Sequence, residues 1–297
     1  MAGGMVSRFH AMRLATMKLS EMKKILAESN LRLTRSLGQN FLHDLNQLHR
    51  IVAAAHLAPD DSVLEIGPGL GPLTEFLVAK ARRVLAIEKD RRLVEILKRR
   101  FASVPHLTLV CEDALDYLKR RSVDWSECKL VANLPYSVAA PILVELAQAT
   151  RPPRLMVVTL QLEVARRLMA GPGDEAYGVL TLLIQLRYQP QEWFKIPAGC
   201  FFPEPEVDSA CVALVRRATP SLTERERDLF AKIVKRGFSQ RRKMMLKLLK
   251  ADWPAAQLAG VFEQMRISPQ ERAENLSREQ FEQLSRLLGA TGASARE

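Results

Sequence analysis

The residues with the clearest chemical potential are Asn133-Leu134-Pro135-Tyr136, which follow the strand-like run 129–132. The amino group of adenine is a poor nucleophile because its lone pair is delocalised into the ring. An enzyme that methylates such an exocyclic amine must therefore hold the N–H groups with acceptors. The Asn133 side-chain oxygen and the next backbone carbonyl can accept, Tyr136 can stack on the base for roughly 1–3 kcal/mol, and Pro135 stiffens the turn. Taken alone, the tetrapeptide is more typical of an ordinary strand-to-helix turn than of an active site.

A glycine-rich loop upstream predicts a nucleotide-type site. Residues 62–66 have the pattern of a buried strand and run directly into the loop 67–72, GPGLGP, before a helical pattern at 73–78. Glycines let the backbone approach a ligand closely and turn sharply into a helix. Pro72 stands where a dinucleotide-binding loop has its last glycine, so the spacing disfavours a pyrophosphate site.

Acidic residues follow the next two predicted strands. Glu88 ends the strand 84–87, about 20 residues beyond the glycine loop, where a carboxylate can accept hydrogen bonds from both ribose hydroxyls. Asp113 follows the strand 107–110 and could accept a hydrogen bond from an adenine amino group. It could equally be the N-cap of the helix that begins at Ala114. The sequence leaves both roles of Asp113 open, and they are compatible.

These groups should meet, because the carboxyl ends of parallel strands form the ligand crevice of an open α/β sheet. The strand 129–132 delivers Asn133 to the same edge. A cofactor that carries adenosine without pyrophosphate, set beside an acceptor for a base amine, is best explained by S-adenosylmethionine. Its methyl group is already activated, so the protein need only align it. No strong general base is required.

The remaining pattern predicts an α/β chain, with a seven-stranded-type Rossmann-like methyltransferase sheet and a small all-helical C-terminal domain. Further strands are expected at 155–160 and 210–215, and helices at 162–169 and 179–186, before a linker near 216–221 and a region without strand signals. We therefore predict the following segments: an extension over 1–30 that lacks fixed structure, a methyltransferase domain over 31–217, a helical RNA-binding domain over 218–288 and a mobile tail over 289–297.

The charge of the chain favours a polyanionic partner. It has 44 Lys and Arg against 33 Asp and Glu, a net charge of +11, and phosphate neutralisation supplies most sequence-independent affinity for nucleic acid. The sharpest basic cluster lies at 235–250, where apolar residues recur at helical spacing, so we predict a helix with a buried Met and Leu face and outward cations. The predicted RNA-binding residues are Arg236, Arg241, Arg242, Lys243 and Lys247.

Taken together, these motifs resemble those of the ribosomal RNA adenine dimethyltransferases of the KsgA kind. The resemblance runs from SLGQNFL at 36–42 through the glycine loop and Asn133 to FFPEPEVDS at 201–209 and FSQRRK at 238–243. It implies that Asn40 and Leu42 contact the methionine end of the cofactor. The loop and the resemblance together predict as cofactor-binding residues Gln39, Asn40, Leu42, Gly67, Gly69, Gly71, Glu88, Asp113 and Asn133. The catalytic set is Asn133, Leu134, Pro135, Tyr136 and Phe201.

Within that set, the resemblance implies that Phe201 stacks on the flipped target adenine. Filling the core beside Phe202 is the alternative for a phenylalanine whose position is unknown. The family installs two methyl groups on each of two adjacent adenines near the 3′ end of small-subunit ribosomal RNA. The implied partners are therefore the small ribosomal subunit and its RNA, whose target bases must leave their stack, and a role in small-subunit biogenesis follows.

Two other functions stay open. A resistance-type methyltransferase of large-subunit RNA shares most of these motifs, although Leu134 and the segment 238–243 favour the small-subunit family. An assembly factor that binds a pre-subunit, with catalysis dispensable, is compatible with the same cofactor site.

The other expectations concern cofactor class and location. The four cysteines show no paired CxxC spacing and no His at a ligand interval, so we expect no metal. No run approaches the roughly 20 apolar residues of a membrane span, and we expect a cytoplasmic monomer. The first twenty residues are basic and loosely resemble a transit peptide, but an upstream start codon is the simpler explanation.

Overall fold

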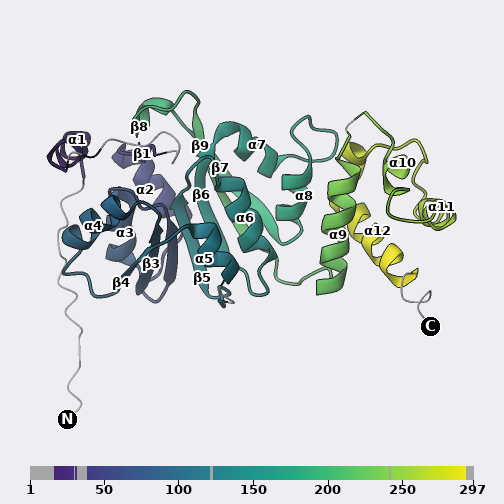
Figure 1. The fold of residues 1–297 in the computed structure, drawn as a ribbon, viewed down its shortest axis with the longest axis horizontal. Coiled ribbons are helices and arrows are strands. Elements are labelled where there is room, and N and C mark those ends of the chain that lie inside the picture. Colours follow the sequence, from purple (N-terminus) through teal and green to yellow (C-terminus); the bar gives the residue numbers. More distant parts are fainter. Residues whose placement is uncertain (1–16, 30, 32–38, 121–122, 241, 292–297) are drawn as a thin grey trace, which may run out of the picture.

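A seven-stranded sheet forms the centre of the larger part of the molecule (Figure 1). The computed structural model describes residues 17–29, 31, 39–120, 123–240 and 242–291. The strand order is β4-β3-β2-β5-β6-β9-β7, in which β9 is antiparallel to both β6 and β7 and the other pairs are parallel. The strands are β2 (Ser62–Ile66), β3 (Arg83–Glu88), β4 (Leu107–Cys111), β5 (Cys128–Asn133), β6 (Leu155–Gln161), β7 (Tyr188–Ile196) and β9 (Ser209–Arg216).

Helices cover both faces of this sheet, as the strand sequences require. Alternate side chains of a strand point to opposite faces, so Leu130 and Ala132 of β5 join one core while Val131 joins the other. One face carries α2 (Leu45–Ala54), α3 (Pro72–Lys80) and α4 (Arg91–Arg100), and the other carries α5 (Ala114–Arg120), α6 (Ala139–Gln148), α7 (Leu162–Met169) and α8 (Val179–Gln185). The predicted Rossmann-like sheet is confirmed.

A two-stranded ribbon lies beside the sheet. The strand β1 (Phe41–Leu42) pairs antiparallel with β8 (Phe201–Phe202), which follows the short 3-10 helix η2 (Ala198–Cys200). Segments that are far apart in the sequence are thereby joined, since Leu42 pairs with Phe201, 159 positions further along the chain. The ribbon holds the segment that begins at Gln39 near the sheet.

The edge strand β7 is absent from the sequence prediction. Its burial alternates only weakly, Pro190 interrupts it, and a register shift separates Pro190 from Trp193. Proline and bulges are found mainly on edge strands, and Trp193 is 49% exposed. An edge strand with one solvent-exposed face lacks the apolar pattern from which the buried strands were predicted.

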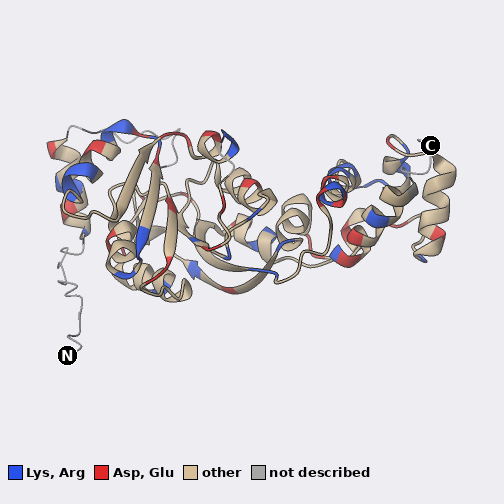
Figure 2. Cartoon of the chain, turned by 90° about the horizontal axis from the view of Figure 1, so that it is seen from below, with Lys and Arg blue, Asp and Glu red and all other residues tan. Residues whose placement is uncertain are grey.

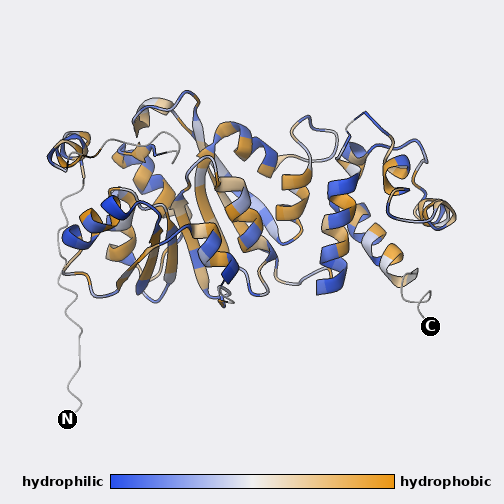
Figure 3. Cartoon of the chain, in the orientation of Figure 1, coloured by the Kyte–Doolittle hydropathy of each residue, from blue (hydrophilic) through white to orange (hydrophobic). Residues whose placement is uncertain are grey.

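The C-terminal region is helical and has a core of its own. It contains α9 (Glu224–Gly237), α10 (Met245–Leu249), α11 (Ala255–Gln264), η3 (Ala273–Asn275) and α12 (Arg278–Thr291). Its buried centre includes Phe230, Phe262 and Phe281, together with Leu182 and Leu183 of α8. The helix α8 is almost wholly apolar and lies between the sheet and α9 (Figure 3). The apolar core of the helical region therefore extends across residue 217 into the sheet region.

The prediction of one helix over 235–250 is wrong, because α9 ends at Gly237 and α10 begins at Met245. The Phe238 ring packs against Tyr177 and Phe281, and the Ser239 hydroxyl donates to the Arg236 carbonyl at 2.7 Å. Such local side-chain hydrogen bonds compete with helix continuation. Met245 is buried as expected, whereas Met244 is 39% exposed.

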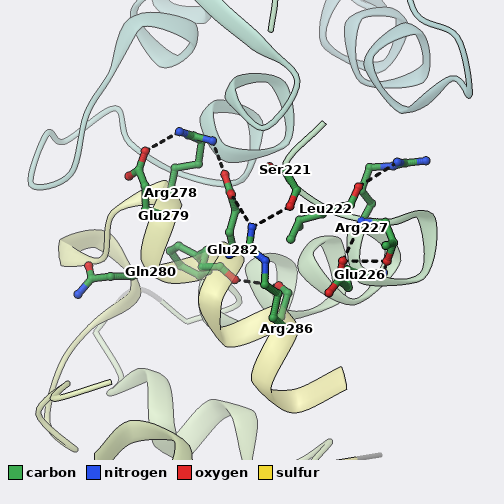
Figure 4. Close-up of polar contacts among 12 residues, drawn as sticks. Ser221, Leu222, Glu226, Arg227, Arg278, Glu279, Gln280, Glu282 and Arg286 are labelled. Atoms are coloured by element: carbon green, nitrogen blue, oxygen red, sulfur yellow. Dashed lines mark hydrogen bonds and ion pairs between the residues drawn. The ribbon is translucent and has the colours of Figure 1, made fainter. Parts of the chain in front are cut away.

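Polar contacts fasten the end of the linker to α9 and α12 (Figure 4). Thr223 and Glu226 form a capping box at the start of α9, which satisfies two otherwise unpaired N–H groups. Arg286 on α12 donates to the Ser221 carbonyl at 2.7 Å, and Arg227 donates to the Leu222 carbonyl at 3.3 Å.

Residues 17–29 correct the expectation that the segment 1–30 lacks fixed structure. The helix α1 (Leu19–Glu28) buries Met22 and Leu26 against Leu70 and Ile96. An amphipathic helix that covers apolar residues of the sheet region gains free energy from that burial. Residues 1–16 lie outside the described part of the chain.

The expectation of a mobile tail over 289–297 is corrected at residues 289–291, because α12 continues to Thr291. Residues 292–297 lie outside the described part of the chain. Lys and Arg occur at both ends of the molecule, on α4 as well as on the C-terminal helices (Figure 2).

Among the described residues, no helix is long and apolar enough to cross a membrane.

Candidate active site

A cavity lies at the carboxyl ends of β2, β3, β4 and β5, where the sequence predicted a ligand crevice. The structure brings most of the predicted site residues to it. Those that line the cavity are Gln39, Asn40, Leu42, Gly67, Gly69, Glu88, Asp113, Asn133, Leu134, Pro135 and Tyr136.

Two loop glycines lie where no side chain fits. Gly69 has φ +62°, and a Cβ atom there would stand 2.6 Å from the Phe41 ring. Gly67 has φ +70°, and its Cβ would lie 3.2 Å from the Pro135 ring. Positive φ and close contact both require glycine. The loop is thus packed between Pro135, which follows β5, and Phe41 of the ribbon strand β1, and its backbone lies along the cavity.

The prediction that Gly71 binds the cofactor is corrected, because Gly71 does not line the cavity. It is the N-cap of α3 with φ +88°, and a Cβ there would lie 2.7 Å from the Phe101 ring on α4's C-cap. Pro72 and Leu73, the first residues of α3, do line the cavity. Gly71 is needed for packing between α3 and α4.

The Glu88 carboxylate is fixed by backbone donors. Its Oε2 accepts from the Gly69 N–H at 3.1 Å, and its Oε1 accepts from the Asp90 N–H at 2.9 Å. It is 8% exposed, and burial raises its pKa. Each oxygen keeps a second lone pair, so the group can still accept from a ligand hydroxyl.

Asp113 has the capping role that the sequence left open. Its Oδ1 accepts from the Leu115 N–H at 2.9 Å and the Asp116 N–H at 3.3 Å. Its Oδ2 accepts from Lys89 Nζ at 2.9 Å, and this ammonium lowers the pKa of Asp113. The carboxylate therefore stays ionised at the cavity, and the cap does not prevent it from contacting a ligand.

The backbone carbonyl of Asn40 orients the Asn133 amide. Its Nδ2 donates to the Asn40 carbonyl at 2.9 Å. Only the amide nitrogen can donate to a carbonyl, so this bond also fixes the direction of Oδ1. Among the described residues Oδ1 is buried and has no hydrogen-bond partner. A buried acceptor without a donor is costly and rare, and it suits a ligand that brings an N–H group.

The Tyr136 ring is held at its far end. Its hydroxyl lies 2.5 Å from Ser209 Oγ on β9, and burial raises the pKa of Tyr136. Leu134, 1% exposed, anchors the turn between the two functional side chains in the core. An aromatic ring that is fixed at its hydroxyl offers a rigid surface for a flat ligand.

The structure does not bring Phe201 to the cavity. It is 2% exposed and belongs to the core with Leu42 and Leu48. Successive strand residues point to opposite sides, so Phe201 points inward while its neighbour Phe202 is partly exposed, with Lys23 Nζ 5.2 Å from its ring centre. The observed role is core filling, and the geometry does not support stacking on a base.

Sequence reasoning missed two buried carboxyl groups. Glu65 lines the cavity, is 1% exposed and accepts from Thr74 Oγ1 at 2.7 Å. Burial, with a smaller contribution from the charge of Glu88, raises the pKa of Glu65 to about 8. Asp90 accepts from Gln39 Nε2 at 3.1 Å. An acidic residue within the apolar strand 62–66 was the available signal for Glu65.

The charge of the cavity fits a cationic adenosine cofactor. Its ionisable lining residues are Glu65, Glu88, Lys89, Glu112 and Asp113, of which Glu65 has a pKa raised to about 8 and Lys89 is paired with Asp113. Such a lining disfavours a pyrophosphate and favours a sulfonium. Together with the strand order and the glycine cradle, it defines a Rossmann-like S-adenosylmethionine-dependent methyltransferase. No group of three or more His, Cys, Asp and Glu side chains in the described part of the chain could hold a metal ion.

Comparisons with known proteins place the chain more narrowly. The family model for ribosomal RNA adenine dimethylase matches residues 30–289, and this chain belongs to that family. It is 39% identical over 276 residues to the ribosomal RNA small subunit methyltransferase A of Latilactobacillus sakei, covering 90% of this chain and 93% of the relative. A relative of the same name from Geobacillus thermodenitrificans is 37% identical over 276 residues, with 90% and 94% covered.

Two solved structures are also similar. A dimethyladenosine transferase from Plasmodium falciparum has a TM-score of 0.74 and 26% identity, covering 85% of this chain and 98% of that one. The 23S rRNA methyltransferase ErmE has a TM-score of 0.64 and 27% identity, covering 84% and 100%. The fold of this chain therefore matches those of two RNA-modifying enzymes over most of its length.

Proposed function

We propose that this protein transfers methyl groups from S-adenosylmethionine to the exocyclic amines of two adjacent adenines near the 3′ end of small-subunit ribosomal RNA, two groups to each. The observation that carries the proposal is the Asn133 amide, whose Nδ2 is bonded to the Asn40 carbonyl while Oδ1 stays buried without a partner. The relatives at 36–39% identity, all named small subunit methyltransferase A, support the choice of substrate.

One set of residues binds the cofactor, and another set holds the target base. Gly67 and Gly69 give the cofactor access to the backbone, and Glu88 accepts from its ribose. Bound there, S-adenosylmethionine supplies an activated methyl group. Asn133 Oδ1 accepts a hydrogen bond from the adenine amine and draws the nitrogen toward tetrahedral geometry, and the Tyr136 ring supports the base face. Catalysis then rests on alignment and needs no strong base.

The test is methyl transfer from labelled S-adenosylmethionine to small subunits from cells that lack this modification, with mass spectrometry of the digested RNA. We expect dimethyladenosine in the 3′-terminal fragment. Label in large-subunit RNA instead would assign the protein to the resistance-type activity that its likeness to ErmE leaves open. Tight binding to small subunits without any transfer would favour an assembly factor.

We also propose how the chain meets RNA. The segment 218–288 acts as the RNA-binding domain beside the methyltransferase domain 31–217, and the exposed side chains of Arg242, Lys243 and Lys247 contact phosphates. Arg236 can contribute less, because its Nε lies 2.5 Å from Asp252 Oδ2. Arg241 lies outside the described residues. A role in small-subunit biogenesis, a cytoplasmic location and a monomeric state complete the proposal.

A further inference from the structure

The helix α1 lies at the end of the molecule away from the helical region, beside the sheet that carries the cavity (Figure 1). The match to the family model begins at residue 30, so α1 lies outside it. Met22 of α1 is fully buried and shares one apolar cluster with Phe41 of the ribbon and Leu70 of the glycine loop. The helix is therefore packed against the two segments that form one wall of the cofactor cavity.

The Phe41 ring belongs both to the α1 cluster and to the cavity. It lines the cavity and lies against Gly69, where an added Cβ atom would stand 2.6 Å from the ring. Phe202, which pairs with Phe41 across the ribbon, has Lys23 Nζ of α1 at 5.2 Å from its ring centre. Buried side chains are close-packed, so a change on one side of a ring is felt on the other. The packing of α1 therefore bears on the position of the Phe41 ring against the glycine loop.

The Arg100 guanidinium of α4 links the start of α1 to the glycine loop. Its Nη1 donates to the Leu70 carbonyl at 2.7 Å and lies 3.2 Å from Met17 Sδ. Its Nη2 forms an ion pair with Glu75 of α3, and Oε2 of that carboxylate accepts from the Met17 N–H at 3.2 Å. The same two side chains thus hold both the residue that precedes α1 and a backbone carbonyl of the loop.

The residues next to Phe41 extend this connection to the amine acceptor. Asn40 directly precedes Phe41, and its carbonyl accepts from Asn133 Nδ2 at 2.9 Å. Gln39 Nε2 donates to Asp90, the N-cap of α4. A displacement of Phe41 would therefore move a backbone segment that lines the cavity and also orients the Asn133 amide.

We propose that α1 is a positioning element for the cofactor site. Through the cluster that contains Phe41, and through the pair of Arg100 and Glu75, it holds the glycine loop and the segment 39–42 in the geometry that binds S-adenosylmethionine. Docking of α1 and binding of the cofactor then favour each other, because a coupling between two sites is reciprocal. This role rests on the proposed function, in which the cavity holds the cofactor.

The first test is amide hydrogen exchange of the full wild-type chain with and without saturating S-adenosylmethionine. We expect the amides of α1 to exchange at least about fivefold more slowly with the cofactor bound, together with those of the glycine loop. The helix α11 has the same length and lies in the helical region, so it reports any general stabilisation and should slow less than α1. Slower exchange in the loop without a greater effect on α1 than on α11 would overturn the proposal.

The second test compares two buried methionines by calorimetry of cofactor binding. Met22→Ala removes packing from the α1 cluster, and we expect the dissociation constant for S-adenosylmethionine to rise about five- to tenfold. Met22→Leu keeps the volume of the side chain and should restore most of the affinity. Met245 of α10 is likewise fully buried. Met245→Ala should therefore lose stability in urea unfolding and keep its cofactor affinity, which separates positioning from a general loss of stability.

Two results of the second test would contradict the role of α1. One is unchanged cofactor affinity in Met22→Ala, and the other is an equal loss in Met22→Ala and Met245→Ala. If Met22→Ala does not fold, the exchange experiment on the wild type decides. Neither measurement uses RNA, so failure here leaves methyl transfer to be tested separately. A wild type that binds no S-adenosylmethionine would instead contradict the proposed function, and the role of α1 with it.

Discussion

The cavity at the sheet edge and the basic surface of the helical region use polar groups differently. At the cavity, Glu88 is held by two backbone donors and Asn133 by the Asn40 carbonyl. On the helical region, Arg242, Lys243 and Lys247 extend from the surface at exposed positions. The buried groups at the cavity can act on a ligand only if they are placed to within a fraction of an ångström. The exposed cations instead attract RNA through their summed charge, which tolerates small displacements. Single substitutions should therefore abolish function in the first region and only reduce it in the second.

The largest expected effect comes from Asn133→Ala. Loss of the acceptor should lower kcat by about 10²–10³, as for other directed transition-state hydrogen bonds, while cofactor and RNA affinity stay close to those of the wild type. Single-turnover methylation and equilibrium binding of cofactor and RNA would measure this. Asn275→Ala, which removes an exposed amide bonded to Glu271, is the matched control. Unchanged turnover in the Asn133 variant would rule out its role as the amine acceptor.

The next largest effect is a loss of cofactor affinity on substitution of Gly69 in the glycine-rich loop. In Gly69→Ala the new Cβ would stand 2.6 Å from the Phe41 ring at φ +62°, so the loop must move, at a cost of roughly 2–4 kcal/mol from strain and overpacking. We expect cofactor affinity to fall at least about tenfold by calorimetry.

Gly173→Ala separates steric contact from backbone strain, because Gly173 has φ +86° and nothing within 4 Å of its Cβ position. It should lose some stability and keep cofactor affinity. If both variants bound cofactor equally well, the close contact between Gly69 and Phe41 would not matter for the site.

The buried carboxyl group of Glu65 at the cavity should make the stability of the protein depend on pH. Its pKa is raised to about 8 in the folded protein from the ordinary 4.5, so the folded state keeps a proton that the unfolded state releases. Stability of the wild type should therefore fall as pH rises from about 4.5 to 8. Glu65→Gln cannot ionise, and its stability relative to the wild type should grow across this window by an amount on the order of 1–3 kcal/mol.

Urea unfolding at several pH values would measure this difference. Glu263→Gln, at an exposed position on α11, serves as the control and should show no such trend. A constant difference between Glu65→Gln and the wild type from pH 5 to 8 would mean that Glu65 is ionised in the folded protein.

The smallest effect belongs to the basic surface. Lys247→Ala should weaken RNA binding only a few-fold and lower the salt slope by about one, since it removes one phosphate contact, with cofactor affinity unchanged. Lys24→Ala, at the exposed face of α1 near the other end of the molecule, should leave the slope unchanged. A loss from Lys247→Ala as large as that from Asn133→Ala would contradict the distinction between the two regions.

Much of the fold and the cavity could be predicted, because the signals are local. The buried strands of the sheet are apolar runs, and the glycine loop has its own spacing. Glu88 and Asn133 are the last residues of their strands, and Asp113 lies two residues after the end of β4. Parallel strands bring their carboxyl ends together whatever the details of packing. The strand β7 was missed because an edge strand with a bulge at Pro190 lacks that pattern.

By itself, the sequence determined the class of fold, the cofactor edge of the sheet and the excess of positive charge, all of which follow from the order and type of residues along the chain. Only the tertiary structure decided which way individual side chains face. Phe201 points into the core, the Phe101 ring packs against Gly71, and the Asn133 amide is oriented by the Asn40 carbonyl. These outcomes depend on contacts between segments far apart in the chain, which spacing along the sequence does not encode.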